Sequence, residues 1–129
     1  MTIKAYSKAK DGNKNLSTNF KVREFACTDG SDPIFIDTEL VVILQKIRNH
    51  FGAPVTITSA YRTVGVNNAC DGGLYSQHLY GKAADIKVKG VAPSKVAEFA
   101  ESLLQKGGLG RYKTFTHVDV RGTKARWRG

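Results

Sequence analysis

The chain has 129 residues, of which 41% are hydrophobic and 24% are charged, and its formal net charge at pH 7 is +9. This length and composition are typical of a globular chain and not of a disordered one, and they fit a single domain with a hydrophobic core, which we expect to span residues 1–129. The positive charge favours an anionic partner and leaves nucleic acid, an anionic membrane and an anionic wall polymer open.

Residues 1–16 (MTIKAYSKAKDGNKNL) are rich in Lys and Asn and predict an irregular amino-terminal arm. They contain no apolar segment of the kind found in secretory signal peptides. No stretch of the chain approaches the ~18 apolar residues that are needed to cross a bilayer. We therefore expect neither a signal peptide nor a membrane span in this chain.

Hydrophobic spacing predicts the first elements after this arm. Residues 19–27 (NFKVREFAC) carry three spaced apolar residues and predict a short extended segment. Asp37 is a favourable N-cap for a helix over residues 38–51, in which apolar residues recur every three or four positions. Gly52 follows as a typical helix stop.

Strands and a second helix are predicted in the rest of the chain. We expect strands at 55–61 (VTITSAY), 82–90 (KAADIKVKG) and 114–122 (TFTHVDVRG), a helix from Pro93 to residue 106, a Gly- and Asn-rich loop at 63–75 and a basic tail at 123–129. Gly107 and Gly108 end the second helix. This order of elements, with half-polar strands, favours an α+β fold with a mainly antiparallel sheet and flanking helices.

The strand at 114–122 carries ionisable residues on one face. Side chains alternate along a strand, so His117, Asp119 and Arg121 point the same way, and the residues between them face the core. Charged groups need partners when they are buried, so this face suits a functional site better than packing alone. An ordinary ion pair between His117 and Asp119 is the alternative.

The segment SQHLYGKAADI (76–86) places His78 in a loop before the strand that carries Asp85, and Gly81 permits a turn between them. If that strand lies beside the one with His117, the three side chains converge. Two imidazoles and one carboxylate are a zinc donor set that leaves a fourth position for water, which suits hydrolysis. The spacing of His78 and Asp85 also arises by chance, which leaves ordinary surface residues as the alternative.

Together these motifs resemble those of a known family. The pattern S-x-H-x-x-G-x-A-x-D at 76–85, followed by H-x-D at 117–119, is similar to the signature of the zinc D-Ala-D-Ala carboxypeptidase family and related peptidoglycan peptidases. The flanks SAYRT and GGLGRYKTFTHVDVRG resemble those of small single-domain members from bacteria and their phages. The similarity covers about residues 17–128 of the chain.

The resemblance implies the hedgehog/DD-peptidase α+β fold, with a Zn2+ ion held by His78, Asp85 and His117. It implies that Arg62 binds a substrate carboxylate or carbonyl, since a guanidinium can grip a carboxylate through two parallel hydrogen bonds. It also implies that Ser76 forms a hydrogen bond with substrate or with one of the ligands. A surface salt bridge is the alternative for Arg62.

Two positions depart from the pattern of the family. Several relatives carry the catalytic carboxylate three residues before the last ligand, where this chain has Thr114. Asp119 is then the candidate general base, and the alternatives for it are orientation of a ligand or pairing with Arg121. A His that relatives carry two residues before the last ligand is Phe115 here, which leaves Arg62 or the metal to stabilise the oxyanion.

These features predict a zinc-dependent peptidase that hydrolyses the stem peptides of peptidoglycan, either as a D-Ala-D-Ala carboxypeptidase or as an endolysin-like wall endopeptidase. The alternative from another class is a zinc-containing module that binds the wall without catalysis, since hedgehog proteins resemble this site yet act as signals. Nucleic acid is the least favoured partner, because the basic residues are scattered and form no reading motif.

The positive charge suits an anionic wall polymer, to which Lys124, Arg126 and Arg128 are expected to hold the protein in a salt-dependent way. Trp127 is expected either to stack on substrate or to close the core. We expect a monomer that acts at the bacterial cell wall, either as a phage lysis protein or as a module of a longer wall hydrolase.

The remaining chemically distinctive residues are placed outside this site. Cys27 and Cys70 lack the paired spacing of zinc ligands, so a disulfide and two separate thiols both stay open. His50 is expected at the end of the first helix, where a basic side chain interacts favourably with the helix dipole.

Overall fold

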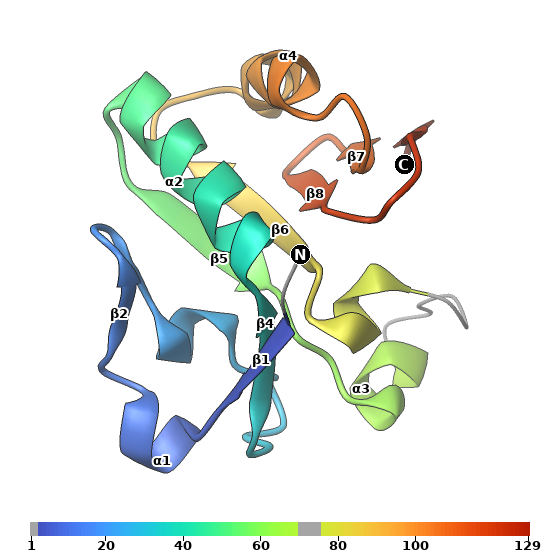
Figure 1. The fold of residues 1–129 in the computed structure, drawn as a ribbon. Coiled ribbons are helices and arrows are strands. Elements are labelled where there is room, and N and C mark those ends of the chain that lie inside the picture. Colours follow the sequence, from blue (N-terminus) through green and yellow to red (C-terminus); the bar gives the residue numbers. More distant parts are fainter. Residues whose placement is uncertain (1–2, 70–75) are drawn as a thin grey trace.

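In a computed structural model of the chain, which describes residues 3–69 and 76–129, a five-stranded sheet is covered by two helices (Figure 1). Two smaller two-stranded sheets accompany it. The elements are β1 (Ile3–Tyr6), α1 (Lys8–Asp11), β2 (Asn15–Ser17), β3 (Phe20–Lys21), the 3-10 helix η1 (Val22–Phe25), β4 (Ile34–Asp37), α2 (Thr38–Phe51), β5 (Val55–Ser59), α3 (Val64–Ala69), the 3-10 helix η2 (Gln77–Tyr80), β6 (Ala83–Val88), α4 (Pro93–Leu103), β7 (Gly108–Arg111), β8 (Thr116–Asp119) and β9 (Ala125–Arg128).

The order of strands in the large sheet is β5-β6-β8-β7-β9. The pairs β5–β6, β6–β8 and β7–β8 are antiparallel, and the pair β7–β9 is parallel. The predicted α+β fold with a mainly antiparallel sheet and flanking helices is therefore confirmed.

Helices α2 and α4 contact each other on one face of this sheet. Helix α2 packs on β5 and β6, and helix α4 packs on β7 and β8. Side chains alternate along each strand, so Ile86, Leu109 and Val118 point into the core beneath the helices, where all three are fully buried. The other face of the sheet carries the alternate residues, which include Asp85 and His117.

Helix α2 spans the predicted residues 38–51. The Asp37 carboxylate accepts a hydrogen bond of 2.9 Å from the backbone N–H of Glu39, and Gly52 ends the helix in the left-handed conformation. The helix has 14 residues. No helix in the described part of the chain combines the length and the apolar character that crossing a membrane requires.

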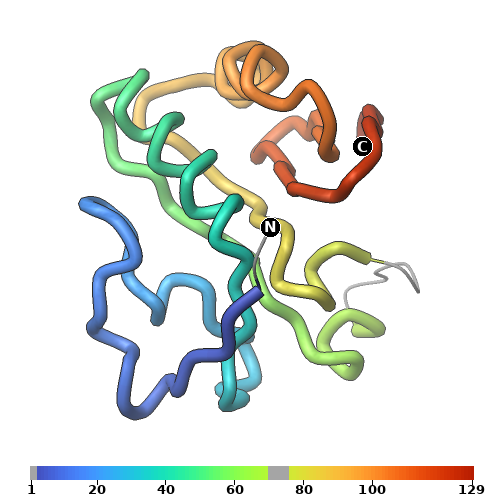
Figure 2. Tube along the Cα trace, in the orientation of Figure 1, coloured from blue at the N-terminus to red at the C-terminus, as the bar shows by residue number. Residues whose placement is uncertain are grey.

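The irregular arm predicted for residues 1–16 is wrong where the structure describes it. Strand β1 pairs antiparallel with β4, with Ile3 opposite Asp37, and β2 pairs with β3. Figure 2 shows this segment, in blue, on the side of α2 away from the carboxy-terminal strands. Strands of three or four residues are too short to show a periodicity, and these form because partner strands elsewhere in the chain pair with them.

The carboxy-terminal half also contains strands that the sequence does not predict. The basic tail at 123–129 contains β9, which pairs with β7. Strand β7 escapes prediction because it contains Gly108 and Gly110, and glycine is rare in strand interiors. The second helix correctly begins at Pro93 but ends at Leu103, three residues before its predicted end.

Two segments in the first half differ in type from the prediction. The extended segment expected at 19–27 is divided between β3 and the 3-10 helix η1. The loop expected at 63–75 contains helix α3. The sequence does not predict this helix, because Gly and Asn have low helix propensity. Residues 70–75 of that loop lie outside the described residues.

The turn at Gly81 fixes the segment that carries His78 against strand β4. Gly81 adopts φ +71°, and a Cβ atom at this position would overlap the backbone carbonyl of Phe35. Its own carbonyl accepts a hydrogen bond of 2.9 Å from the backbone N–H of Asp37. Only glycine therefore fits both the backbone conformation and the space at this turn.

We predict that Gly81→Ala lowers the free energy of unfolding by about 3 kcal/mol, which combines left-handed strain with displacement of the β4 backbone. Gly90 is the control, since its φ is +73° but nothing lies within 4 Å of the added Cβ. Gly90→Ala should cost only about 1–2 kcal/mol. Urea unfolding of the two variants checks this prediction, and equal losses would contradict it.

Candidate metal centre

One row of residues crosses all five strands of the large sheet, on the face opposite α2 and α4. The register places Ser59 of β5 opposite Asp85 of β6, which lies opposite His117 of β8. His117 in turn lies opposite Gly110 of β7, and Gly110 lies opposite Trp127 of β9. Cross-strand neighbours have Cβ atoms about 5 Å apart, so the side chains of this row are in mutual reach.

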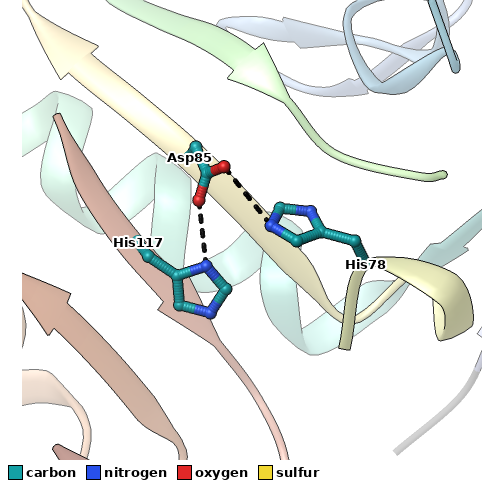
Figure 3. Close-up of side chains that lie close together, drawn as sticks. All are labelled: His78, Asp85 and His117. Carbon is teal, nitrogen blue, oxygen red and sulfur yellow. Dashed lines mark hydrogen bonds and ion pairs between the residues drawn. The ribbon is translucent and has the colours of Figure 1, made fainter. Parts of the chain in front are cut away.

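The turn of η2 brings His78 to the same row. Figure 3 shows the Asp85 carboxylate between the two imidazole rings, with His78 on η2 and His117 on β8. The Oδ1 atom of Asp85 lies 2.9 Å from Nδ1 of His117, and its Oδ2 atom lies 3.4 Å from Nε2 of His78. The three potential ligand atoms all lie within 4.8 Å of one another, and the three residues are buried.

In each imidazole, the nitrogen that faces away from Asp85 forms a hydrogen bond with another residue. The Nδ1–H of His78 donates to the carbonyl of Ala60 at 2.7 Å. The Nε2–H of His117 donates to Oδ2 of Asp119 at 2.7 Å. These hydrogen bonds leave Nε2 of His78 and Nδ1 of His117 as the nitrogens directed at Asp85, the arrangement in which metal-binding histidines are held.

The donor set fits a small divalent metal ion. Zinc bonds of about 2.0–2.1 Å in tetrahedral geometry would separate ligand atoms by roughly 3.3 Å. Nε2 of His78 lies 3.4 Å from Oδ2 of Asp85, and Nδ1 of His117 lies 2.9 Å from Oδ1. The three candidate ligand atoms lie within 4.8 Å of one another, so the side chains would move closer together around an ion. Three protein ligands would leave one position for water or substrate.

The two carboxylates of the site suit a cation, whereas His117 must give up a proton to bind one. Burial would raise the pKa of Asp85, but hydrogen bonds from His117 and His78 hold it well below the usual range of a carboxyl. Burial would likewise raise the pKa of Asp119, but hydrogen bonds from His117 and Arg121 hold it low. For His117 burial would lower the pKa, whereas the bonds to Asp119 and Asp85 raise it above its ordinary value. Both carboxylates are ionised at neutral pH.

Asp119 is fully buried and both of its oxygens are occupied. Oδ1 accepts hydrogen bonds from the backbone N–H of Gly108 at 2.9 Å and from Nε of Arg121 at 2.8 Å. Oδ2 accepts from Nη2 of Arg121 and from His117, both at 2.7 Å. The ring of His117 separates this carboxylate from Asp85, so the placement favours orientation of a ligand over direct proton transfer.

Arg62 borders the site from the loop after β5. Its Nε donates to the Ser59 hydroxyl at 3.0 Å and its Nη2 donates to Oδ2 of Asp85 at 3.3 Å. Its backbone N–H donates to the carbonyl of His78 at 3.0 Å, which ties the two segments together. Arg62 therefore contacts one of the three candidate ligands, and its expected role in binding substrate stays a prediction.

The other residues singled out in the sequence lie at different distances from this centre. Ser76 is half-buried at the start of η2, and its expected hydrogen bond stays a prediction. Thr114 is exposed, and the ring of Phe115 stacks on Tyr112 with centroids 4.3 Å apart. Trp127 packs against His117 with ring centroids 4.9 Å apart, so its indole lies at the site.

The remaining histidine and the cysteines lie elsewhere. His50 lies in the last turn of α2 as predicted, and its ring stacks on Phe99 with centroids 3.7 Å apart. Cys27 is buried with its sulfur 3.5 Å from the backbone nitrogen of Thr63. Cys70 lies outside the described residues, so the two alternatives for this cysteine pair stay open.

Gly108 and Gly110 belong to the site although the sequence does not single them out as site residues. A Cβ atom at Gly108 would overlap the Asp119 carboxylate, and one at Gly110 would lie 2.6 Å from Nε1 of Trp127. The signal that identifies such residues is their spacing of two, which places both on one face of a strand.

Comparison with known proteins supports a peptidase. The chain matches the Peptidase M15 family over residues 15–119. It is 46% identical over 104 residues to a probable peptidoglycan L,D-endopeptidase MepK of Haemophilus influenzae, a match that covers 73% of this chain and 55% of the relative. It is 33% identical over 94 residues to the peptidoglycan L,D-endopeptidase MepK of Escherichia coli K12, which covers 66% of this chain and 51% of the relative. The chain spans about half the length of the curated relatives it matches.

We predict that the protein binds one divalent transition-metal ion per chain and that His78→Gln weakens this binding by more than about 100-fold, beyond what changes around the ligands usually cost. His50→Gln is the control, because His50 lies outside the site. Titration against a chromophoric chelator measures both affinities. Equal affinity of the His78→Gln variant and the unmodified protein would contradict the site.

Proposed function

Because this chain belongs to the Peptidase M15 family, we propose that it is a zinc-dependent peptidase that hydrolyses stem-peptide bonds of peptidoglycan. The observation that carries the proposal is the convergence of His78, Asp85 and His117 on one buried position. Zinc is the proposed ion, since two imidazoles and one carboxylate with an open fourth position are a donor set of catalytic zinc sites.

The proposed bond lies between an L-configured and a D-configured residue of the stem peptide. The two relatives described above are named peptidoglycan L,D-endopeptidases, and the part of the chain that matches the family includes all three proposed ligands. This favours an endopeptidase over the D-Ala-D-Ala carboxypeptidase that the sequence left open. It also favours an enzyme over a zinc-containing module that only binds the wall.

Each residue of the site has a role in this proposal. A zinc ion held there would polarise the scissile carbonyl and acidify a water molecule. Arg62 has N–H groups beyond those bonded to Ser59 and Asp85, and these can donate to a substrate carbonyl or carboxylate. Oxyanion stabilisation is therefore assigned to Arg62 together with the metal, because Phe115 cannot donate a hydrogen bond.

The proposed role of Asp119 is to hold His117 and not to accept the proton of the attacking water. Its carboxylate keeps the proton of His117 on Nε2 and so leaves Nδ1 for the metal. Asp119 has no exposed surface, and its two oxygens are bonded to three other residues. A general base must reach the water within hydrogen-bond distance, which this position does not offer.

Wall attachment is proposed for the exposed basic residues of the tail. Lys124 and Arg128 are exposed and suit anionic polymers of a bacterial cell wall. Arg126 is excluded from this role, because it pairs with Glu101 at 2.7 Å and donates to the carbonyl of Gly107 at 2.8 Å. Action at the cell wall follows from the proposed substrate, whereas a monomeric state and a phage origin stay predictions.

We predict that the protein releases new amino groups and soluble muropeptides from purified peptidoglycan, that a chelator stops this release and that zinc restores it. Mass spectrometry of the fragments identifies the cleaved bond, with peptidoglycan from Gram-negative and Gram-positive bacteria as substrates. A zinc-loaded protein that releases nothing from either substrate would contradict the proposed activity.

We predict that Arg62→Lys lowers kcat/KM by about 100-fold, the scale of losing one donor to a developing oxyanion, with metal affinity nearly unchanged. Arg48→Lys on α2, on the far side of the sheet, is the matched control and should retain full activity. The steady-state kinetics of both variants provide the test. Full activity of Arg62→Lys would remove Arg62 from the mechanism.

We predict that Asp119→Asn weakens zinc binding by about 10- to 100-fold and that saturating zinc restores most of the activity. If Asp119 were the general base, activity would stay about 100-fold or more below that of the unmodified protein at every zinc concentration. Activity measured across a zinc titration separates the two roles.

A further inference from the structure

The guanidinium of Arg121 forms a bidentate ion pair with the carboxylate of Asp119. Its Nε donates to Oδ1 at 2.8 Å and its Nη2 donates to Oδ2 at 2.7 Å. The backbone N–H of Arg121 adds a third hydrogen bond to Oδ1 at 3.2 Å. A fork of this kind fixes the plane of the carboxylate as well as its position, which a single point charge does not.

The plane of this carboxylate determines how the ring of His117 is held. Oδ2 of Asp119 accepts the hydrogen bond from Nε2 of His117 and also one arm of the fork. Asp119 is fully buried, so no water competes for these oxygens. The orientation of Nδ1 of His117 toward the metal position therefore depends on Arg121 through one intermediate residue.

The indole of Trp127 packs against both Arg121 and His117. The guanidinium carbon of Arg121 lies 5.2 Å from the centroid of the Trp127 ring, within the range of cation–π attraction. The centroid of the same indole lies 4.9 Å from that of the His117 ring. Its Nε1–H donates to the hydroxyl of Tyr112 at 2.9 Å, and Gly110 leaves room for the ring. The indole thus holds the guanidinium in place beside the metal ligand.

We infer that Arg121 is a positioning residue that sets the orientation of His117, through Asp119, for metal binding. The inference deepens the proposed function and rests on its metal site. A lysine at this position would keep the positive charge but lose the two parallel hydrogen bonds, so the charge alone does not fulfil this role. Loss of the two parallel hydrogen bonds from Arg121 is therefore expected to lower the affinity of the site for the metal.

The test is a double-mutant cycle on zinc affinity, measured by competition with a chromophoric chelator on the full chain. We expect Arg121→Lys to weaken zinc binding by about 10-fold, as loss of an orienting partner does. We expect Arg121→Lys combined with Asp119→Asn to bind zinc as Asp119→Asn does, because the two residues act in series. Arg48→Lys is the matched control and should bind zinc as the unmodified protein does.

Two results would overturn the inference. One is an Arg121→Lys variant that binds zinc as tightly as the unmodified protein. The other is a double variant in which the two losses multiply, since that would mean that Arg121 acts independently of Asp119. If Arg121→Lys does not fold, as judged by urea unfolding, Arg121→Gln with Asp119→Asn removes both charges together. Affinity equal to that of Asp119→Asn then supports the inference, and a further 10-fold loss overturns it.

The proposed function fails separately from this inference. If the unmodified protein binds no zinc, the proposed function and this inference both fail, because both depend on the metal site. If the unmodified protein binds zinc but cleaves no peptidoglycan, only the proposed activity fails. The double-mutant cycle on zinc affinity then still tests the role of Arg121.

Discussion

The antiparallel register that sets Asp85 of β6 opposite His117 of β8 decides which face of the sheet each ionisable residue occupies. A slip of one residue would turn Asp85 into the core and bring Ile86 out to the site, because strand side chains alternate. Burial of Ile86 and Val118 beneath the two helices opposes such a slip. The hydrophobic core therefore sets the geometry of the polar face, and the turn at Gly81 adds His78 to it.

The polar face is buried, so each charge on it needs a partner. Asp85 contacts both imidazoles and Arg62, and Asp119 contacts His117 and the Arg121 fork. In a medium of low dielectric such a network is favourable only when every member is satisfied. A metal ion would take the position between the two imidazoles and the Asp85 carboxylate, and the bonds on the far side of each ring would stay in place. The same contacts thus stabilise the fold and prepare the site.

Long periodic elements and spaced motifs could be predicted from the sequence, and short elements could not. Helix α2 follows from its apolar spacing and its Asp37 cap, and the approach of His78, Asp85 and His117 was expected from motifs on two strands. Strands β1, β7 and β9 have four residues each and form by pairing with other strands, which the hydrophobic pattern of so short a segment does not record. Pairing of Arg121 with Asp119 was predicted only as one of the alternatives for Asp119. Strand alternation predicts which residues share a face, but it does not predict which of them form hydrogen bonds with one another.

The central claim is that two imidazoles and one carboxylate hold a single zinc ion through defined atoms. The most direct test is a crystal structure of the zinc-loaded protein with anomalous diffraction at the zinc edge. We expect one ion at about 2.0–2.2 Å from Nε2 of His78, an oxygen of Asp85 and Nδ1 of His117. The hydrogen bond from Nε2 of His117 to Asp119 should persist. An ion bound through Nε2 of His117, or bound elsewhere in the molecule, would contradict the account.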